Sequence, residues 1–446
     1  MYNLIIYLYL LGVAVASRFS EKVRKMWRGE RDAFRVLREQ VQPGARYVWF
    51  HAASLGEFEQ GRPLMEQLRR QRPELKILLT FFSPSGYEVR KDYPGADIIC
   101  YLPLDTPLNA RRFLRLIRPE VAYFIKYEFW YNYLHILKHR RVPVYSVSSI
   151  FRDGQVFFRW YGRQYGRVLK CFTHFYVQNE KSRELLATIG IDNVTITGDT
   201  RFDRVLQIKE QARQLPLVDT FLDNRAPTSD LSHQASALNL QSSVSNPQSP
   251  KVFVAGSSWP PDEEIFISYF RDHPEWRLII APHVIAEEHL QQIEKRLGAS
   301  RVVRYTQLQR QQEGNGGGEA HLPSSFYNLP SLIVDCFGLL SSIYRYATVA
   351  YVGGGFGVGI HNTVEAAVWG VPVVFGPNNG KFQEAQELKA CGGGFETGSY
   401  DDFARLMDRF GSDPQFTAAA GRAAAQYVKQ KAGATSRILA DTLTGR

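Results

Sequence analysis

The stretch TVAYVGGGFGVGIHNTVEAAVWGVPVVFGP, residues Thr348–Pro377, decides the fold of the second half of this chain. It begins with an apolar run, Val349–Val352, of the kind that forms a buried parallel strand. Five glycines follow within seven positions, and then come a helix-like segment, Asn362–Trp369, and a second apolar run, Val371–Phe375. Strand, glycine loop, helix and strand together predict a βαβ unit.

The glycine loop, residues 353–359, has two interpretations. Such a loop can bring backbone N–H groups and a helix N-terminus against a phosphate. Glu365 would then lie in the first helical turn, where its carboxylate could accept hydrogen bonds from ribose hydroxyls. The alternative is a tight turn in which Asn362 caps the helix and Glu365 completes a capping box. That alternative does not explain five glycines, so the loop favours a nucleotide site.

Length and composition limit the possible classes of protein. A chain of 446 residues is too long for one core and predicts two domains. Its hydrophobic fraction of 44% is that of a packed globular protein. The four cysteines are far apart, so neither a zinc cluster nor a disulfide framework is indicated, and a reducing cytoplasm is the simplest setting. A net charge of +10 calls for an acidic partner such as nucleic acid, anionic lipid or a phosphorylated substrate.

The N-terminal sequence favours attachment of the protein to a membrane. Residues 1–17 are almost wholly apolar, and a cluster of arginines and lysines follows them at once. A secretory signal peptide carries its positive charge before the apolar run, and here no basic residue precedes it. The run is short against the roughly 20 residues of a spanning helix, so spanning and interfacial attachment both stay open. We predict an anchor on an anionic inner membrane, with the rest of the chain on the cytoplasmic side.

Short apolar strands alternate with amphipathic helices through the rest of the chain. This alternation predicts two doubly wound, Rossmann-like α/β domains that face a cleft, where small molecules commonly bind. We place the first domain at residues 18–210 and the second at 251–446, with its final helix packing back. Residues 211–250 include a segment rich in Ser, Gln, Asn and Pro, which predicts a linker or surface insertion. A second loop of this kind is predicted at Gly314–Ser325.

The strongest chemical candidate in the first domain is the segment HAASLGE, residues 51–57. It follows a predicted strand and opens a helix, so Ser54 lies in the turn and Glu57 at the helix start. A carboxylate there could take a proton from a hydroxyl. The alternative is that Glu57 is only a favourable first-turn charge.

Five motifs in this order resemble one family, the Kdo (3-deoxy-D-manno-octulosonic acid) transferases of lipopolysaccharide synthesis. They are HAASLGE, KYEFWYN, TGDTRFD, AGSSW and HNTVE. The resemblance implies a two-domain GT-B fold and an inverting glycosyltransferase that needs no metal and no cofactor. It implies transfer of Kdo from CMP-Kdo to a lipid A precursor, at the cytoplasmic face of the inner membrane.

The resemblance also assigns residues. Glu57 matches the general base of the family, which deprotonates the acceptor hydroxyl. The CMP site matches three pieces of the second domain, which are Pro282 and His283; Phe337, Gly338 and Leu339; and Asn362, Thr363, Val364 and Glu365. This chain departs from the family where many members have Arg in place of His283 and Glu in place of Leu339. Both departures concern the nucleotide contacts.

Lys126 lies in an otherwise apolar and aromatic stretch and could bind the Kdo carboxylate or a lipid phosphate, with Ser54 beside the acceptor. The alternative for Lys126 is an ion pair with Glu128. Two rival functions stay open: another GT-B enzyme that uses a UDP-sugar, and a membrane-bound nucleotide-binding protein without catalysis. Nucleic-acid binding is disfavoured because the basic residues cluster near the anchor.

Overall fold

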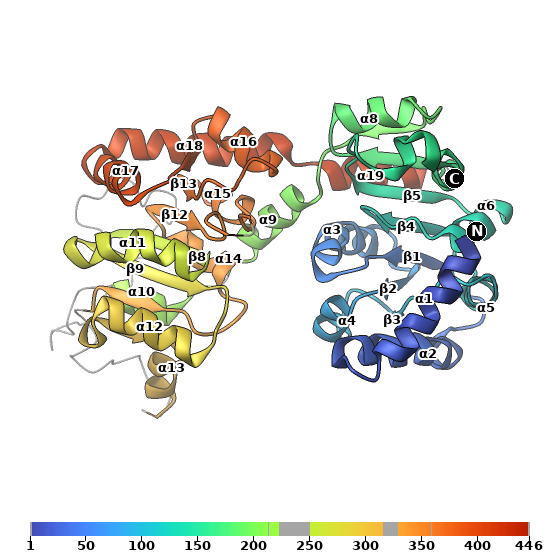
Figure 1. The fold of residues 1–446 in the computed structure, drawn as a ribbon, viewed down its shortest axis with the longest axis horizontal. Helices are drawn as coiled ribbons and strands as arrows, with labels where there is room; N and C mark the ends of the chain where they lie inside the picture. Colours follow the sequence, from blue (N-terminus) through green and yellow to red (C-terminus); the bar gives the residue numbers. More distant parts are fainter. Residues whose placement is uncertain (1, 213, 223–249, 315–328, 358, 445–446) are drawn as a thin grey trace. The chain divides into compact units, whose positions relative to one another are not determined.

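The computed structural model describes residues 2–212, 214–222, 250–314, 329–357 and 359–444. The chain divides into two compact units, each described by itself below. Unit 1 contains Met1–Arg204 and Lys431–Arg446, and unit 2 contains Val205–Gln430. Each unit is a parallel β-sheet with helices on its faces (Figure 1).

The sheet of unit 1 has seven strands in the order β3-β2-β1-β4-β5-β6-β7. After β3 the chain crosses back past β2 and β1, so that β4 pairs with β1 on its other side, as in a doubly wound sheet. The central strands are fully buried, which explains their continuous apolar runs. The strands are β1 Tyr47–His51, β2 Lys76–Phe81, β3 Ile98–Tyr101, β4 Val121–Ile125, β5 Val144–Ser149, β6 His174–Val177 and β7 Val194–Ile196.

Successive strand residues of unit 1 enter different cores, because side chains alternate across a sheet. Trp49 packs in the core with residues of α2, α5 and α6, whereas Phe50 packs in the core with residues of α3 and α19. The C-terminal helix α19 thus completes the core of the N-terminal unit. The helices of unit 1 are α1 Tyr2–Ala16, α2 Glu21–Gln40, α3 Leu55–Gln71, α4 Pro84–Arg90, α5 Pro107–Ile117, α6 Tyr131–His139, α7 Arg163–Gly166, α8 Glu180–Ala187 and α19 Ala434–Thr444, and α9 Arg201–Glu210 continues into unit 2.

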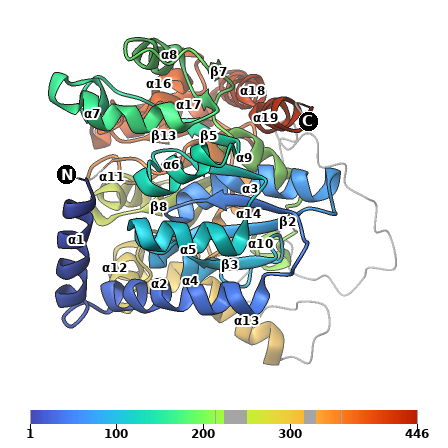
Figure 2. The same ribbon diagram turned by 90° about the vertical axis from the view of Figure 1, so that its right-hand side faces the viewer.

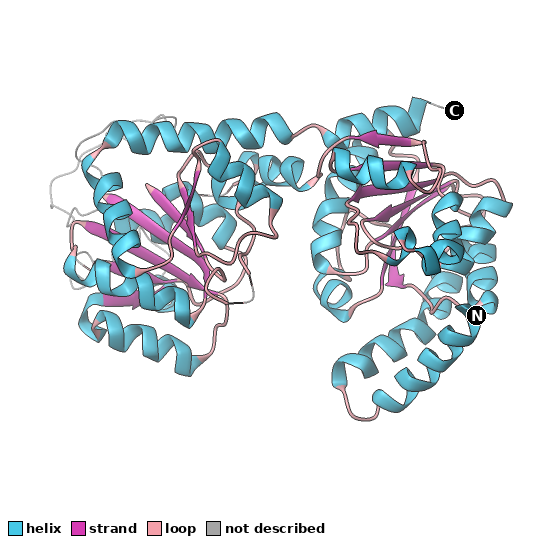
Figure 3. Cartoon of the chain, turned by 45° about the horizontal axis from the view of Figure 1, so that its top comes forward, coloured by secondary structure: helices cyan, strands magenta, loops and turns pink. Residues whose placement is uncertain are grey.

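Unit 2 repeats this plan with the order β10-β11-β9-β8-β12-β13-β14, all parallel (strands in Figure 3). One core packs the sheet against residues of α11, α12 and α17. Its strands are β8 Lys251–Ser258, β9 Trp276–Pro282, β10 Val302–Arg304, β11 Ser331–Ile333, β12 Val349–Val352, β13 Val373–Phe375 and β14 Gly394–Glu396. Its helices are α10 Pro216–Leu222, α11 Pro260–Asp272, α12 Glu287–Leu297, α13 Tyr305–Gly314, α14 Leu340–Ile343, α15 Val364–Ala367, α16 Gln383–Ala390, α17 Tyr400–Ser412 and α18 Pro414–Lys431, which ends where the chain returns to unit 1.

The first two helices, α1 and α2, run in different directions, meet at a turn and contact each other (Figure 2). Most apolar side chains of α1 are exposed, including Leu4 at 64%, Leu8 at 60% and Leu11 at 65%. Among the described helices, none is both long enough and apolar enough to cross a membrane.

The fold differs from the sequence prediction in three places. The short strands β7 and β14 were not predicted. Helix α10 occupies part of the predicted linker 211–250. Its Leu217, Val218 and Phe221 form the apolar face of this helix and are buried. Residues 223–249 of that linker lie outside the described residues, as does most of the loop Gly314–Ser325. The predicted helix Asn362–Trp369 is only a four-residue helix, α15.

Candidate functional site

Glu57 lies in the first turn of α3, immediately beyond the carboxyl end of β1. Ser54 is the N-cap residue, with an extended backbone. The Glu57 Oε2 atom accepts a hydrogen bond from the Ser54 backbone N–H at 2.9 Å and lies 3.3 Å from the Ser54 Oγ. This contact satisfies one N–H group at the helix start and fixes the direction of the carboxylate. Glu57 therefore has the first-turn position that the sequence predicted, and this position is compatible with a chemical role.

Burial raises the pKa of the Glu57 carboxyl above its ordinary value, and the negative charge of Glu128 raises it further. The charges of His51 and Lys126 and the Ser54 backbone N–H act on this pKa in the opposite direction. The net effect is a carboxylate that holds a proton more tightly than an exposed glutamate does. A raised proton affinity suits a group that must accept a proton near neutral pH.

Glu128 is a functional candidate that the sequence prediction treated only as an ion-pair partner of Lys126. Its Oε2 accepts hydrogen bonds from the His51 Nε2 at 3.0 Å and from the Trp130 indole at 2.7 Å. On the other side of the imidazole ring, the His51 Nδ1 lies 2.9 Å from the Thr80 Oγ1. The motifs HAASLGE and KYEFWYN therefore meet, because β1 and β4 are neighbours in the sheet. That adjacency cannot be obtained from the sequence order alone.

Lys126 has a left-handed backbone, with φ of 61°, directly beyond β4. Ser148, within the neighbouring strand β5, is also left-handed with φ of 52°. Such conformations are costly for residues other than glycine and often occur at functional sites. The positive charge of Lys126 acts to lower the pKa of two carboxyl groups, Glu57 and the buried Asp199, although burial raises the pKa of Glu57 overall. Its assignment to a Kdo carboxylate or lipid phosphate stays a prediction.

In unit 2, side chains on both sides orient Glu365. Its Oε1 accepts from the Asn362 side-chain amide at 2.9 Å, and its Oε2 accepts from the Ser341 hydroxyl at 2.7 Å. The Asn362 Oδ1 accepts from the Val364 backbone N–H at 3.2 Å. The N-cap residue of α15 is Thr363. Asn362 and Glu365 thus pair through their side chains instead of forming the capping box that was the alternative interpretation.

Four N–H groups of the glycine loop are used within the fold and not for the phosphate that the sequence predicted. The N–H of Gly353 donates to the Gly256 carbonyl, and that of Gly354 donates to the Asp262 carboxylate. The N–H groups of Gly357 and Gly359 both donate to the Gly354 carbonyl. The prediction is wrong for these four groups, because the loop uses them to hold its own shape.

Close packing explains why glycines occupy this loop. A Cβ atom on Gly353 would lie 2.3 Å from the Ser257 carbonyl oxygen, and one on Gly355 would meet the backbone of Gly376. Gly354 and Gly359 have φ of 95° and 126°, which other residues rarely adopt. The glycines therefore do not by themselves indicate a ligand, and the prediction of a nucleotide site rests on the side chains around them.

His283 follows Pro282, the last residue of β9, and lies between two other rings. Its ring centroid is 4.6 Å from that of Trp259 and 4.5 Å from that of His361, and both pairs are stacked. The Trp259 indole N–H also donates to the His361 Nε2 at 3.2 Å, and burial lowers the pKa of His361. Trp259 and His361 were missed as site residues, although the motifs AGSSW and HNTVE contain them.

The third predicted piece is the loop after β11. Phe337 is 83% exposed, and Gly338 has φ of 90°. Leu339 is the N-cap residue of α14, and the Ser341 contact described above ties this helix to Glu365. The three predicted pieces of the CMP site therefore gather at the carboxyl ends of β9, β11 and β12. No group of three or more His, Cys, Asp or Glu side chains that could hold a metal ion occurs in the described part of the chain.

Comparisons with known proteins address the family. Residues 19–204 match the family model described as 3-deoxy-D-manno-octulosonic-acid transferase (kdotransferase). The 3-deoxy-D-manno-octulosonic acid transferase of Aquifex aeolicus is 26% identical over 359 residues, which cover 78% of this chain and 81% of that protein. The enzyme of the same name from Haemophilus influenzae is 23% identical and covers 89% of this chain and 86% of its own.

Solved structures show the same fold at low identity. A putative UDP-N-acetylglucosamine 2-epimerase from Listeria monocytogenes superposes with a TM-score of 0.57 at 12% identity, over 88% of this chain and 95% of that one. MurG of Acinetobacter baumannii superposes with a TM-score of 0.52 at 10% identity, over 90% of this chain and all of that one. The fold is thus a GT-B-like pair of α/β domains, and the resemblance to the Kdo transferases that the motifs predicted is confirmed by the family model over residues 19–204 and by relatives that cover most of this chain.

Proposed function

We propose that this protein is an inverting glycosyltransferase that moves Kdo from CMP-Kdo to a lipid A precursor, similar to lipid IVA, in lipopolysaccharide synthesis. The observation that carries the proposal is the half-buried Glu57 carboxylate in the motif HAASLGE, within the segment that matches the family. Its fixed direction and raised proton affinity are the properties that a general base needs.

The reaction follows from these groups. Glu57 takes the proton of an acceptor hydroxyl, whose oxygen attacks the ketosidic carbon of Kdo on the face opposite the leaving group. The bond from that carbon to the phosphate oxygen breaks, and CMP departs with the electron pair. Because donor and leaving group are both anionic, positive charge near them favours departure. His283, directly after β9, would donate a hydrogen bond to the phosphate of CMP.

The nucleotide contacts are proposed for the three pieces that gather in unit 2. The Glu365 carboxylate would accept hydrogen bonds from the ribose hydroxyls, since Asn362 and Ser341 already hold it in one orientation. Pro282, Phe337, Gly338, Leu339, Thr363 and Val364 would line the rest of the CMP site. Lys126 and Ser54 would bind the Kdo carboxylate or the acceptor.

The acceptor is a lipid, so the protein must work at a membrane surface. The exposed apolar side chains of α1 and the basic residues that follow support attachment to an anionic inner membrane, with both units on the cytoplasmic side. An interfacial α1 fits its length of 15 residues better than a spanning one.

Mass spectrometry of the product tests the proposal. Purified protein is incubated with CMP-Kdo and a tetra-acylated lipid A precursor in detergent, and the lipid should gain the mass of one or more Kdo residues. A matched reaction contains UDP-N-acetylglucosamine in place of CMP-Kdo. Transfer only from the UDP-sugar would refute the donor, and CMP binding without any transfer would refute the enzymatic function.

A further inference from the structure

We infer that His51 is a positioning residue that holds the Glu128 carboxylate in place beside Glu57. This inference rests on the proposed role of Glu57 as the general base. It concerns a buried group outside the residues that touch substrate in the proposed reaction. His51 is 0% exposed, so it acts through its neighbours and not by direct contact with a ligand.

Both ring nitrogens of His51 are occupied. The Nε2 atom faces the Glu128 carboxylate, which can only accept when ionised, so Nε2 must carry a hydrogen. The Nδ1 atom lies 2.9 Å from the Thr80 hydroxyl oxygen and 3.2 Å from the Thr80 carbonyl. A neutral ring would accept from the hydroxyl, and a protonated ring would donate to the carbonyl. The bond to Glu128 is the same in either state.

The surrounding residues keep the ring from turning. The Trp49 indole donates to the Thr80 Oγ1 at 2.8 Å, and Thr80 is itself fully buried. Phe124 and Trp130 each pack edge-on against the imidazole, with ring centroids 5.6 Å away. The chain of contacts Trp49–Thr80–His51–Glu128 thus crosses three neighbouring strands and ends at a single carboxylate oxygen.

The position of Glu128 matters because its charge acts on Glu57. The Trp130 indole donates to the same Oε2 atom as His51 does, so two N–H groups define where this oxygen lies. Without His51, one of these two donors is lost, and the carboxylate gains freedom to rotate away. We therefore expect kcat to fall, because the charge of Glu128 is no longer held at a fixed place relative to Glu57, whereas substrate affinity should change little.

The plain alternative is a core histidine that contributes only to stability. A kinetic double-mutant cycle separates the two roles. His51→Leu and His51→Gln are each made in the wild-type protein and in a Glu128→Gln background, and kcat, KM and melting temperature are measured on the same preparations with CMP-Kdo and a lipid A precursor. Gln keeps an N–H donor, whereas Leu does not. The control is His174→Leu, which removes a half-buried imidazole whose Nε2 contacts the Thr195 hydroxyl at 2.8 Å in the same sheet.

We expect His51→Leu to lower kcat by about 10- to 100-fold with KM changed less than about threefold, which is the scale of a small misplacement at a reacting centre. His51→Gln should recover most of that loss, and His174→Leu should keep the wild-type kcat. In the Glu128→Gln background, the same His51 substitutions should change kcat less than about twofold.

Two results overturn the inference. One is a lowered melting temperature with unchanged kcat in His51→Gln and His51→Leu. The other is an equal loss of kcat with and without Glu128, which would show that His51 does not act through this carboxylate. If His51→Leu does not fold, His51→Met, which also lacks an N–H donor, takes its place in the comparison with His51→Gln. A Glu57→Gln variant with wild-type turnover would instead refute the proposed function, so the two failures are distinguishable.

Discussion

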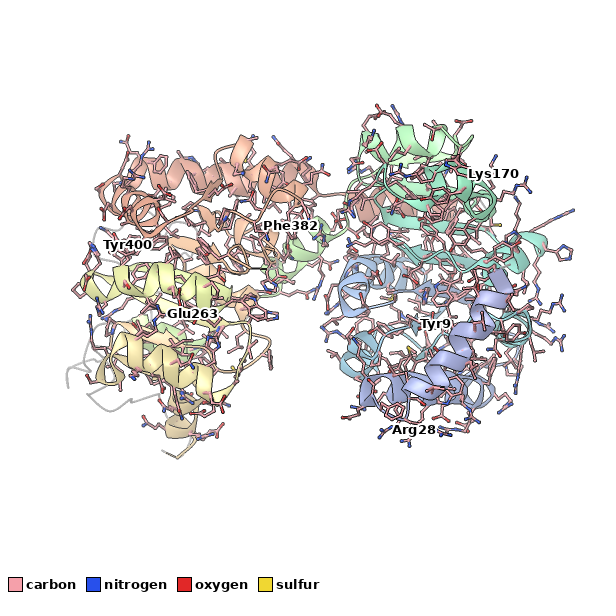
Figure 4. All side chains as sticks on the ribbon, in the orientation of Figure 1. Tyr9, Arg28, Lys170, Glu263, Phe382 and Tyr400 are labelled. Carbon is pink, nitrogen blue, oxygen red and sulfur yellow. The ribbon has the colours of Figure 1, made fainter. Side chains whose placement is uncertain are left out.

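Glu30 is a buried acid on α2 whose replacement should stabilise the protein at neutral pH. Its side chain is 6% exposed, and its Oε1 has no hydrogen-bond partner within the described structure. Burial raises the pKa of Glu30 from 4.5 to about 8, although the Leu104 backbone N–H partly offsets this effect. Burial raises the pKa of Tyr9 on α1, which is labelled in Figure 4, and the charge of Glu30 raises it further.

The sign of the effect follows from proton binding. Between pH 4.5 and 8 the unfolded chain has lost the proton of Glu30 and the folded protein has kept it. The folded state therefore loses stability as pH rises through this window, because the unfolded state binds fewer protons. One pKa unit corresponds to about 1.4 kcal/mol, so the cost is below about 1 kcal/mol at pH 5, about 3 kcal/mol at pH 7 and about 5 kcal/mol above pH 8.

Glu30→Gln removes this cost, since the amide is close in size to the protonated acid and does not ionise. Urea unfolding of both proteins at pH 5 and pH 8.5 should show the variant gaining about 4 kcal/mol relative to wild type between the two values. Any constant cost of burying the amide cancels in that comparison. The matched control is Glu39→Gln on the same helix, where the side chain is 57% exposed and pairs with Arg35. Equal pH dependence in Glu30→Gln and wild type would refute the reasoning.

Three further predictions concern the proposed activity. Glu57→Gln should fold and bind CMP normally but lose about 10²- to 10⁴-fold in turnover, and wild-type turnover in the variant would contradict the base assignment. Because the pKa of Glu57 is raised, the wild-type rate should rise with pH through an acidic limb that lies above the ordinary glutamate value of about 4.3. Glu365→Gln should weaken CMP binding by about 1.5–3 kcal/mol in calorimetry with little change in melting temperature, and unaltered affinity would argue for a structural role only. Deleting residues 1–17 should release much of the protein from vesicles that contain anionic lipid, with CMP affinity intact and residual binding that weakens as salt rises; complete retention in high salt would disprove the anchor.

The sequence by itself determined the class of fold and the family. Buried parallel strands must be apolar on both faces, so the run Val349–Val352 was predicted as a strand with the observed bounds of β12. The strands β7 and β14 were missed because each has three residues and only partial burial. The motif HAASLGE was sufficient to place Glu57 at a helix start, since the hydrogen bond to the Ser54 backbone is local in sequence.

Only the tertiary structure decided which distant residues act together. The His51–Glu128 contact joins residues 77 positions apart, and it exists because β1 pairs with β4. The same applies to the stack of Trp259, His283 and His361, which comes from the ends of three neighbouring strands. The glycine loop shows the converse: its composition resembled a phosphate cradle, yet four of its N–H groups are used within the fold. Composition reports which conformations a loop can adopt, whereas the partners of its backbone depend on what packs beside it.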